Sequence, residues 1–501
     1  YTGDIGEIDL EDGYLKITDR KKDIIVSAGG DNISPAKIEN MITNELEIDQ
    51  CMVYGGVWYG RSLYRRMSDL ESGYYGMGVL GVFRVLMAVL FTVAYLPHVY
   101  GQPAAAPFAQ RPAIENSLLA ERLDELLPKL MREQNIDLWI VVAREYNDDP
   151  AFLSLVPKPR FTARRTTMLL FHDRGKEQGV ERLTISRYPL GELYEPAWQG
   201  GDLDAQWRRL AELVKARNPN KIAVNVSDTW PVADGLSHGL YLKLEKALGE
   251  ELSERLVSSE NLVVRWLETR TSAEVEVWQR AVAIARSAIA EAFSERVITP
   301  GVTTLGEVAW FIRERFEVAG LAPWFHPDVN RQWQGADYGS AEFLGAGYAQ
   351  TIIKRGDLLH TDVGLCYLGL CTDTQEMGYV LKLGETAPPA GLVQAMTAGN
   401  EWQDVLTSQF KTGRSGNEIL AAAQKQLQDK GITHAIYTHP LGVFGHAPGP
   451  TIGMWDNQGP TPGRGDWLLY PMTGYAIEGR VTVNIPEWNN EPVQMKLEQS
   501  A

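Results

Sequence analysis

The chain has 501 residues, a formal net charge of −16 and only three cysteines. This length is enough for two or three domains with their own buried cores. The negative charge argues against nucleic acid or an anionic membrane as a partner, because both attract basic surfaces. Three cysteines also exclude a disulfide-rich scaffold.

The first 62 residues differ from the rest of the chain. They contain TGD at 2–4, DRKKDII at 19–25 and GGDNISPAKIE at 29–39. These motifs resemble the start of the small C-terminal domain of adenylate-forming enzymes, the acyl-CoA synthetase family. The resemblance implies that Asp4 and Arg20 would contact a nucleotide ribose. The large domain that binds ATP and the acyl group has no counterpart, and a site without most of its walls cannot bury a ligand. We therefore interpret 1–62 as a fusion remnant or a gene-model artefact, and a ligase function as the weaker alternative.

The segment 67–106 looks like a second start of the chain. An arginine at position 84 precedes an apolar run over 85–96, and small residues follow it. The run is short for a membrane span and has the shape of a secretory signal. If translation begins near Met67 or Met77, we expect a secreted or periplasmic enzyme. If the fused N-terminus is real, the run would be a membrane anchor or a buried helix.

Helical and strand-like patterns alternate between residues 111 and 268. An amphipathic helix is expected around four apolar positions, Leu118, Leu123, Leu126 and Leu130. Strands are expected at 136–142, 167–171 and 221–226, and a helix at 205–216. This alternation predicts an α/β domain. The segment resembles the N-terminal domain of creatinase, prolidase and aminopeptidase P, which implies a role in the substrate entrance and in subunit contacts.

The region 271–501 begins with helices. Capping-box spacings at Thr271 and Thr304 predict two helix starts. Asn417 predicts the start of a third helix that stops at Gly431. These helices would cover one side of a sheet built from the later strands, and periodicity alone predicts an α+β fold.

Two aspartates lie in the stretch GDLLHTDVGLCYLGLCTDTQE, residues 356–376. Asp362 and Asp373 each follow an apolar, strand-like run, and a turn around Gly369 joins the two runs as a hairpin. Two buried carboxylates side by side repel, so they need a proton, a cation or a metal between them. For this pair alone, solvated residues beside a turn are an equally good interpretation.

Cys366 and Cys371 flank the same hairpin turn and could face each other. Spacing alone cannot establish a disulfide. We expect two small core residues rather than a bridge.

Further candidate ligands follow in the C-terminal half. His439 and His446 lie in THPLGVFGHAPGP, Glu478 in GYAIEGRVTV and Glu498 in VQMKLEQ. Four carboxylates and one imidazole suit manganese, cobalt, iron or zinc. With the two aspartates, these motifs resemble the pita-bread metallopeptidases, which include methionine aminopeptidase, aminopeptidase P and prolidase. The resemblance implies two divalent metal ions, manganese first, held by Asp362, Asp373, His439, Glu478 and Glu498.

The same resemblance implies the fold and the reaction. We expect an α+β protein, with a pita-bread catalytic domain containing a curved antiparallel sheet over 271–501 behind a creatinase-type α/β domain. The expected function is that of an aminopeptidase or dipeptidase of Xaa-Pro type that attacks the peptide bond with a hydroxide bridging the two metal ions. Glu478 would act as general base and then acid, and His446 would donate to the oxyanion. We expect peptide or dipeptide substrates and a homodimer.

Two histidines have less certain roles. His360 shares a strand face with Asp362 and is expected to support the ligands rather than to bind metal. The family has a substrate-facing histidine about seventeen residues before the first aspartate, near 342–345 here, where no histidine occurs. His326 is the remaining candidate for that catalytic role.

Two alternatives use the same fold without metal chemistry. One is a creatinase-like hydrolase and the other is a peptide-binding module, and both typically lack most of the ligand set. The five matching residues therefore favour the metallopeptidase. The sequence APGPTIGMWD after His446 departs from the family's usual His-Asp or His-Glu ending and leaves the proline specificity open.

Overall fold

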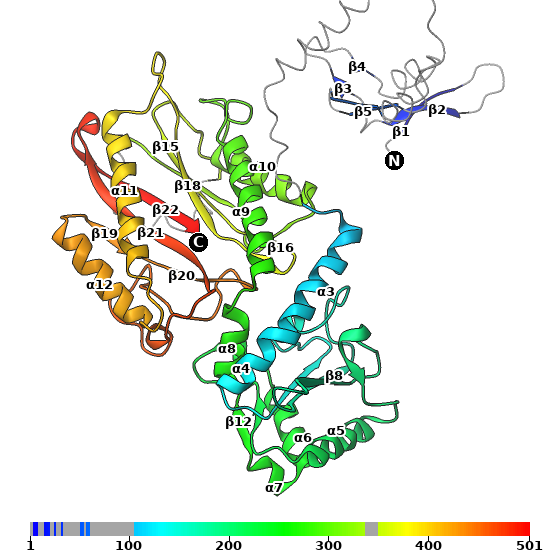
Figure 1. Ribbon diagram of the computed structural model, residues 1–501. Helices are drawn as coiled ribbons and strands as arrows, with labels where there is room; N and C mark the ends of the chain where they lie inside the picture. The colour runs from blue at the N-terminus through cyan, green and yellow to red at the C-terminus, as the bar shows by residue number, and fades with distance from the viewer. Residues whose placement is uncertain are drawn as a thin grey trace, which may run out of the picture. The chain divides into compact units, whose positions relative to one another are not determined.

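The computed structural model describes residues 105–335 and 349–501, together with the backbone of short strands before residue 61 (Figure 1). The chain divides into two compact units, 1–99 and 100–501. The signal-like segment expected over 67–106 lies almost entirely outside the described residues. Within the described part, none of the helices combines the length and the hydropathy that a membrane span requires.

The first unit contains short antiparallel strand pairs. The described strands are β1 Asp4–Ile8, β2 Leu15–Arg20, β3 Ile25–Val26, β4 Asn32–Ile33, β5 Cys51–Tyr54 and β6 Val57–Gly60. They pair in chain order, β1 with β2, β3 with β4 and β5 with β6. The first pair places Asp4 opposite Arg20. The ribose contacts expected of these two residues concern side chains outside the described part of the chain.

The second unit begins with an α/β lobe. Its helices are α3 Arg111–Glu121, the π-helical turn Arg122–Leu126, α4 Leu127–Glu133, α5 Leu203–Arg217, α6 His238–Leu248, α7 Glu250–Ser253 and α8 Glu260–Glu268. Its strands are β7 Leu138–Arg144, β8 Thr166–Asp173, β9 Val180–Ile185, β10 Glu195–Pro196, β11 Ile222–Val224 and β12 Leu256–Ser258. They form one mixed sheet in the order β10-β9-β8-β7-β11-β12.

The central strand β7 explains why this lobe has three layers. Leu138 and Ile140 belong to the core that also contains residues of α5 and α6. Trp139 and Val141 belong to the opposite core, with residues of α4 and α8. A strand that is covered on both faces is apolar along its whole length, as the sequence is here. The predicted α/β alternation is confirmed.

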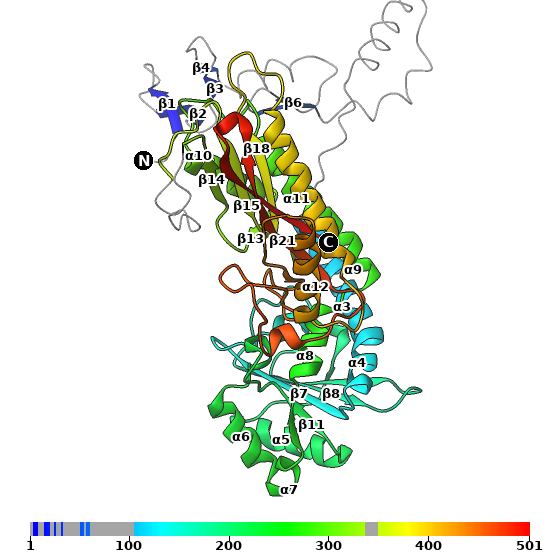
Figure 2. The same ribbon diagram turned by 90° about the vertical axis from the view of Figure 1, so that its left-hand side faces the viewer.

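The second lobe of this unit has one large antiparallel sheet. Its helices are α9 Ser272–Ala292, α10 Leu305–Val318, α11 Ala390–Ser408 and α12 Gly416–Asp429. Its strands are β13 Ala322–Pro323, β14 Asp328–Gln332, β15 Leu358–Val363, β16 Leu365–Tyr367, β17 Leu370–Cys371, β18 Thr374–Tyr379, β19 His434–Ile436, β20 His439–Leu441, β21 Gly474–Ile485 and β22 Glu491–Ser500. The large sheet has the order β14-β15-β18-β22-β21-β19, and β20 also pairs with β21. The helices lie along one face of this sheet (Figure 2).

The helix starts follow the capping residues. The capping boxes predicted at Thr271 and Thr304 are both present. The third helix begins at Gly416 instead of Asn417, because Ser415 is its N-cap and closes a capping box of its own. The Asn417 side chain instead holds the loop before β21, where its Oδ1 accepts the backbone N–H of Thr461 at 2.8 Å. The predicted start at Asn417 was therefore wrong by one residue.

The hairpin turn contradicts one expectation. Cys366 on β16 lies directly opposite Cys371 on β17, and the two form a disulfide. Leu368 and Gly369 form the turn with φ values of 50° and 78°, a conformation that brings the two flanking strands into close register. The expectation of two unlinked core cysteines was wrong, because the turn is tight enough to place them face to face.

Helix α11 supports the sheet through Trp402. This side chain is fully buried and lies so close to Gly479 on β21 that a Cβ there would collide with its ring. We predict that Trp402→Ala lowers the free energy of unfolding by about 3–5 kcal/mol, because the surrounding core cannot fill the cavity. Urea denaturation followed by circular dichroism measures this loss. Trp310→Ala, at a side chain that is 55% exposed, is the control and should cost less than about 1 kcal/mol. Equal losses in the two variants would contradict the packing argument.

Candidate active site

The register of neighbouring strands places three carboxylates in one row. Asp362 on β15 lies opposite Gln375 on β18. Gln375 also pairs with Glu498 on β22, which in turn lies opposite Glu478 on β21. Residues directly opposite each other in antiparallel strands point to the same face of the sheet. That face is turned away from the helices, because the alternate residue Leu497 contacts α11.

Asp373 joins this row from the loop between β17 and β18. Its backbone carbonyl accepts a hydrogen bond from the Ser500 hydroxyl at 2.8 Å. The Asp373 N–H also lies 3.4 Å from the same hydroxyl oxygen. The end of β22 therefore fixes the backbone of this aspartate beside the row.

His439 is the first residue of β20. Its Nδ1 lies 3.1 Å from the Pro440 carbonyl oxygen, which can only accept a hydrogen bond, so Nδ1 carries the proton. The lone pair of Nε2 therefore points to the carboxylates. Nε2 lies 3.7 Å from Glu478 Oε2, 3.7 Å from Glu498 Oε1 and 3.8 Å from Asp373 Oδ2.

These distances suit a shared cation. They are too long for direct hydrogen bonds. An ion that binds its ligands at about 2.0–2.2 Å separates neighbouring ligand atoms by about 3–4 Å. Three groups of described residues could hold an ion in this way with all their ligand atoms within 4.8 Å of one another; these are His439 with Glu478 and Glu498, Asp362 with Asp373 and Glu498, and Asp373 with His439 and His446.

Several buried ligand atoms have no hydrogen-bond partner among the described residues. They are Asp362 Oδ1, Asp373 Oδ1, His439 Nε2 and both carboxylate oxygens of Glu498. Each such atom costs about 1–3 kcal/mol when it is buried without a partner. Divalent cations bound among these residues would satisfy these atoms, and oxygen-rich sets with one imidazole suit manganese, cobalt, iron or zinc. The residues therefore fit a metal site.

The pKa values of these side chains in the metal-free protein also indicate that the cluster fits a cation. Burial raises the pKa of Asp362 to about 7. Burial, together with neighbouring carboxylates, raises the pKa values of Asp373, Glu478 and Glu498 well above their usual range. Burial lowers the pKa of His439 to about 3, so this ring is neutral near pH 7 and can act as a ligand.

Gln375 is a site residue that the sequence reasoning missed. Its Nε2 donates to Glu478 Oε1 at 2.7 Å and lies 3.4 Å from Asp362 Oδ2. It lies two residues after Asp373, the spacing at which strand residues share a face. This spacing could have identified it.

His360 acts on the ligands through Gln375. Its Nε2 lies 2.8 Å from Gln375 Oε1, and its Nδ1 lies 3.1 Å from Asn330 Nδ2. The amide oxygen can only accept and the amide nitrogen can only donate, so the neutral ring donates through Nε2 and accepts at Nδ1. With both ring nitrogens occupied, His360 supports the row and is not placed as a ligand.

His446 lies at the boundary between the ligand cluster and an adjoining cavity. Its ring meets that of His439 edge to face, with centroids 4.5 Å apart. Its Nε2 is 3.3 Å from the Tyr437 hydroxyl, a contact that the sequence did not indicate. The cavity has a volume of about 260 Å³, and its lining includes these three residues together with Trp230 and Arg464.

His326 is not brought to the cluster. It is exposed, and its ring lies 4.7 Å from that of Trp310 on α10. None of the possible metal-binding groups among the described residues includes it. Positions 342–345, where the resemblance would place the substrate-facing histidine, lie outside the described residues. A catalytic role for His326 stays a prediction without geometric support.

The raised carboxylate pKa values predict how metal and pH act together on stability. Between about pH 6.5 and 8.5, the folded metal-free protein holds more protons than the unfolded chain, so rising pH favours unfolding. Bound divalent ions need deprotonated carboxylates, so their stabilising effect grows over the same range. Mn²⁺ should therefore raise the melting temperature, relative to that measured with a chelator, by an amount that increases with pH. Differential scanning calorimetry measures this difference.

The control for this experiment is the double variant Asp362→Asn, Asp373→Asn. Without two of the carboxylates, the gain from Mn²⁺ should largely disappear at every pH. A gain in the unmodified protein that stays constant or shrinks as the pH rises would contradict the metal-site interpretation.

Comparison with known proteins accounts for the two parts of the chain separately. The N-terminal segment matches acyl-CoA ligases. A long-chain-fatty-acid–CoA ligase of Mycobacterium tuberculosis is 52% identical over 54 residues, 11% of this chain and 9% of the ligase. A 2-succinylbenzoate–CoA ligase of Geobacillus is 47% identical over 55 residues, 11% of each chain. This chain thus spans about a tenth of the length of these ligases.

The second unit is similar to solved peptidase structures. An X-Pro aminopeptidase of Thermotoga maritima aligns with a TM-score of 0.53 and 19% identity, over 74% of this chain and 94% of that one. A Xaa-Pro dipeptidase of Bacillus anthracis aligns with a TM-score of 0.53 and 19% identity, over 76% and 94%. The α+β pita-bread fold behind a creatinase-type α/β domain is therefore confirmed.

The residues of the candidate site coincide with a family match. Residues 276–481 match the family model of metallopeptidase family M24. This range contains Asp362, Asp373, His439 and Glu478, and Glu498 follows it on the neighbouring strand. The part of the chain that carries the candidate site is therefore similar to the metallopeptidases of family M24.

Proposed function

We propose that this protein is a dinuclear metal-dependent aminopeptidase or dipeptidase that cleaves Xaa-Pro bonds. The observation that carries the proposal is the group of buried ligand atoms that find no hydrogen-bond partner in the described part of the chain, beside a cavity that His439 and His446 line. The names of the two solved relatives, an X-Pro aminopeptidase and a Xaa-Pro dipeptidase, support this substrate class.

Five residues would hold two divalent metal ions, namely Asp362, Asp373, His439, Glu478 and Glu498. Manganese is proposed first because the donor set is rich in oxygen, with cobalt, zinc or iron as alternatives. When bound, such ions supply a water of lowered pKa and polarise the peptide carbonyl.

Glu478 is the proposed proton carrier of the reaction. Gln375 Nε2 donates to its Oε1 at 2.7 Å, so the other oxygen, Oε2, is left to accept and release a proton. It would take the proton from the attacking water and pass it to the leaving nitrogen.

His446 is the proposed hydrogen-bond donor to the developing oxyanion. The Tyr437 hydroxyl, 3.3 Å from Nε2, orients the ring. Burial and the charge of Glu478 raise the pKa of Tyr437, so its hydroxyl keeps its proton near neutral pH. Both groups line the cavity and could contact a substrate there.

The cavity walls support a small, rigid, apolar group next to the scissile bond. Trp230, Pro231 and Val232 reach it from the α/β lobe, and Pro448 and Met454 line it from the peptidase lobe. A proline ring is such a group. The lining from both lobes would also limit the length of the peptide that enters.

Two further proposals concern the cellular compartment and the oligomeric state of the enzyme. The disulfide supports an oxidising compartment, and thus export. A homodimer is the proposed oligomeric state, and light scattering would test it.

The central prediction concerns two site residues. Asp362→Ala and Glu478→Gln should each lower kcat/KM on Xaa-Pro dipeptides by more than about a hundredfold, since even outer partners of metal ligands cost up to that much. Peptidase assays with manganese, cobalt and zinc in turn measure the loss, and circular dichroism checks the fold. Glu317→Gln, at an exposed position on α10, is the control and should retain activity. Normal turnover in either site variant would refute the assignment.

Elemental analysis separates this function from its alternatives. The proposal expects about two transition-metal ions per chain, each satisfying a share of the unpaired ligand atoms. A creatinase-like hydrolase or a peptide-binding module would contain none.

Arg464 provides a prediction on substrate length. It is exposed, lines the same cavity, and can pair with the free carboxylate of a dipeptide. Arg464→Ala should raise the KM for a free Xaa-Pro dipeptide by about tenfold, because the variant loses one charged hydrogen bond to the substrate. The kcat should change little. The amidated dipeptide should show no such change, and Arg464→Lys should recover part of the loss. Equal effects on both substrates would exclude carboxylate recognition by this residue.

A further inference from the structure

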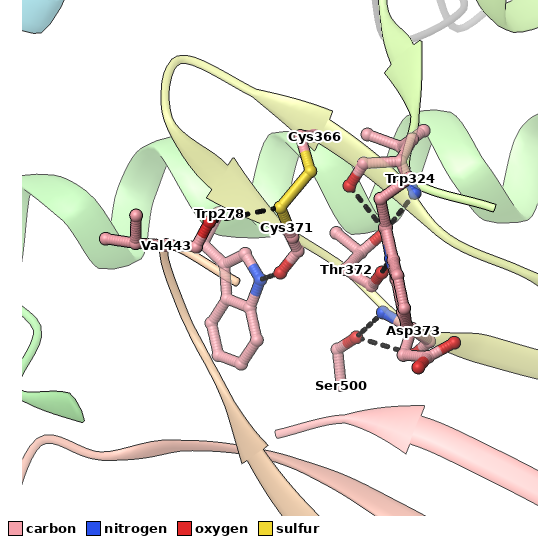
Figure 3. The surroundings of a disulfide bond; sticks show 9 residues. Trp278, Trp324, Cys366, Cys371, Thr372, Asp373, Val443 and Ser500 are labelled. Carbon is pink, nitrogen blue, oxygen red and sulfur yellow. Dashed lines mark hydrogen bonds between the residues drawn. A yellow bond between two sulfur atoms is a disulfide. The ribbon is translucent and has the colours of Figure 1, made fainter. Parts of the chain in front are cut away.

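The Cys366–Cys371 disulfide lies at the end of the hairpin whose arms carry two of the proposed metal ligands (Figure 3). Cys366 follows Asp362 by four positions on one arm, and Cys371 precedes Asp373 by two positions on the other. The sulfur–sulfur bond is thus a covalent tie between the two aspartate-bearing segments. This bond lies beyond Val363 and Thr374, the pair at which the ladder between β15 and β18 ends.

Cys371 also contacts the segment that carries the histidines. Its backbone N–H donates to the Gly442 carbonyl at 2.7 Å. Its Sγ lies 3.4 Å from the Val443 carbonyl oxygen, and its own carbonyl accepts the indole N–H of Trp278 at 2.9 Å (Figure 3). Because Gly442 and Val443 lie within residues 439–446, the disulfide joins three ligand-bearing segments.

The two residues after Cys371 are held by further contacts. The indole N–H of Trp324 donates to the Thr372 carbonyl at 2.9 Å. The Ser500 hydroxyl donates to the Asp373 carbonyl at 2.8 Å (Figure 3). With these neighbours fixed, a shift of Cys371 is transmitted along two peptide bonds to Asp373.

The disulfide is accessible to a reductant from one side. Both cysteines line a cavity of about 270 Å³, whose lining also includes residues of α3. Cys366 is half-buried, whereas Cys371 is only 4% exposed. An attacking thiolate would therefore reach the sulfur of Cys366 first. The bond closes a very short loop, for which the gain in overall stability is smallest, so its main effect is local.

We propose that Cys366–Cys371 is a thiol–disulfide exchange site that sets the metal affinity of the cluster; this rests on the metallopeptidase function proposed above. A dithiol attacks Cys366 and releases the Cys371 thiolate, and its second thiol then frees Cys366. The protein gains two electrons and two protons, and the dithiol becomes a disulfide. The oxidised form is the one that holds metal tightly, so transfer into an oxidising compartment completes the site.

The test compares metal binding by the oxidised and the reduced protein. The full chain is reduced with dithiothreitol, desalted without oxygen and titrated with Mn²⁺ against a fluorescent chelator, while alkylation and mass spectrometry count the free thiols. Reduction should weaken Mn²⁺ binding about tenfold to a hundredfold, as the loss of ligand-orienting contacts does elsewhere, and reoxidation should restore it. The visible absorption of bound Co²⁺ should also change on reduction, because the position of Asp373 changes. A purely structural bond would leave that spectrum unaltered.

Two variants control the experiment. The double variant Cys366→Ser, Cys371→Ser should bind Mn²⁺ as the reduced protein does, with or without dithiol treatment. Cys51→Ser should bind as the oxidised protein does and should still respond to the dithiol. If the double variant fails to fold, the reversible change in the unmodified protein decides the question.

Two results would overturn the inference while the metal site stands. One is equal Mn²⁺ affinity and an unchanged Co²⁺ spectrum in both redox forms. The other is a disulfide that resists the dithiol in the folded protein. Absence of Mn²⁺ binding in both forms would overturn the proposed function and this inference together.

Discussion

Repulsion among four clustered carboxylates, three of them buried and Asp362 half-buried, is the constraint on which the rest of this structure depends. Asp362, Glu478 and Glu498 share one row across the sheet, and Asp373 lies beside them. Burial and mutual repulsion raise the pKa values of these groups, so without a cation they favour the protonated form. The fold brings them together against this cost. The proposed metal site would give a physical reason for such an arrangement.

The rest of the sheet supplies the rigidity that this arrangement needs. The face opposite the row is covered by α9 to α12, and fully buried Trp402 packs beneath β21 next to Glu478. On the site face, Gln375 and His360 form a hydrogen-bonded relay behind the carboxylates. The disulfide ties the loop that carries Asp373 to the rest of the hairpin. Asp362, Asp373 and Glu478 are thus each held by groups that are not proposed as ligands.

The sequence alone predicted much of this site because its candidate ligands could be recognised as a set. Asp362 and Asp373 by themselves were equally compatible with solvated residues beside a turn, and it was their order along the chain with His439, Glu478 and Glu498 that resembled a known ligand set. Gln375 was missed, because an amide in a strand has many ordinary roles. The disulfide was missed as well, because the pairing of Cys366 with Cys371 depends on the turn conformation, which spacing does not determine.

By itself, the sequence determined the fold class, which depends on local periodicity, and it determined the candidate ligands through the resemblance of their motifs to those of a known family. Tertiary structure alone decided which of these residues meet. Asp362 and Glu478 both meet the side chain of Gln375, whereas His326 lies exposed against Trp310. The reason is that strand register and chain crossing bring together residues more than a hundred positions apart, and no local pattern records that distance.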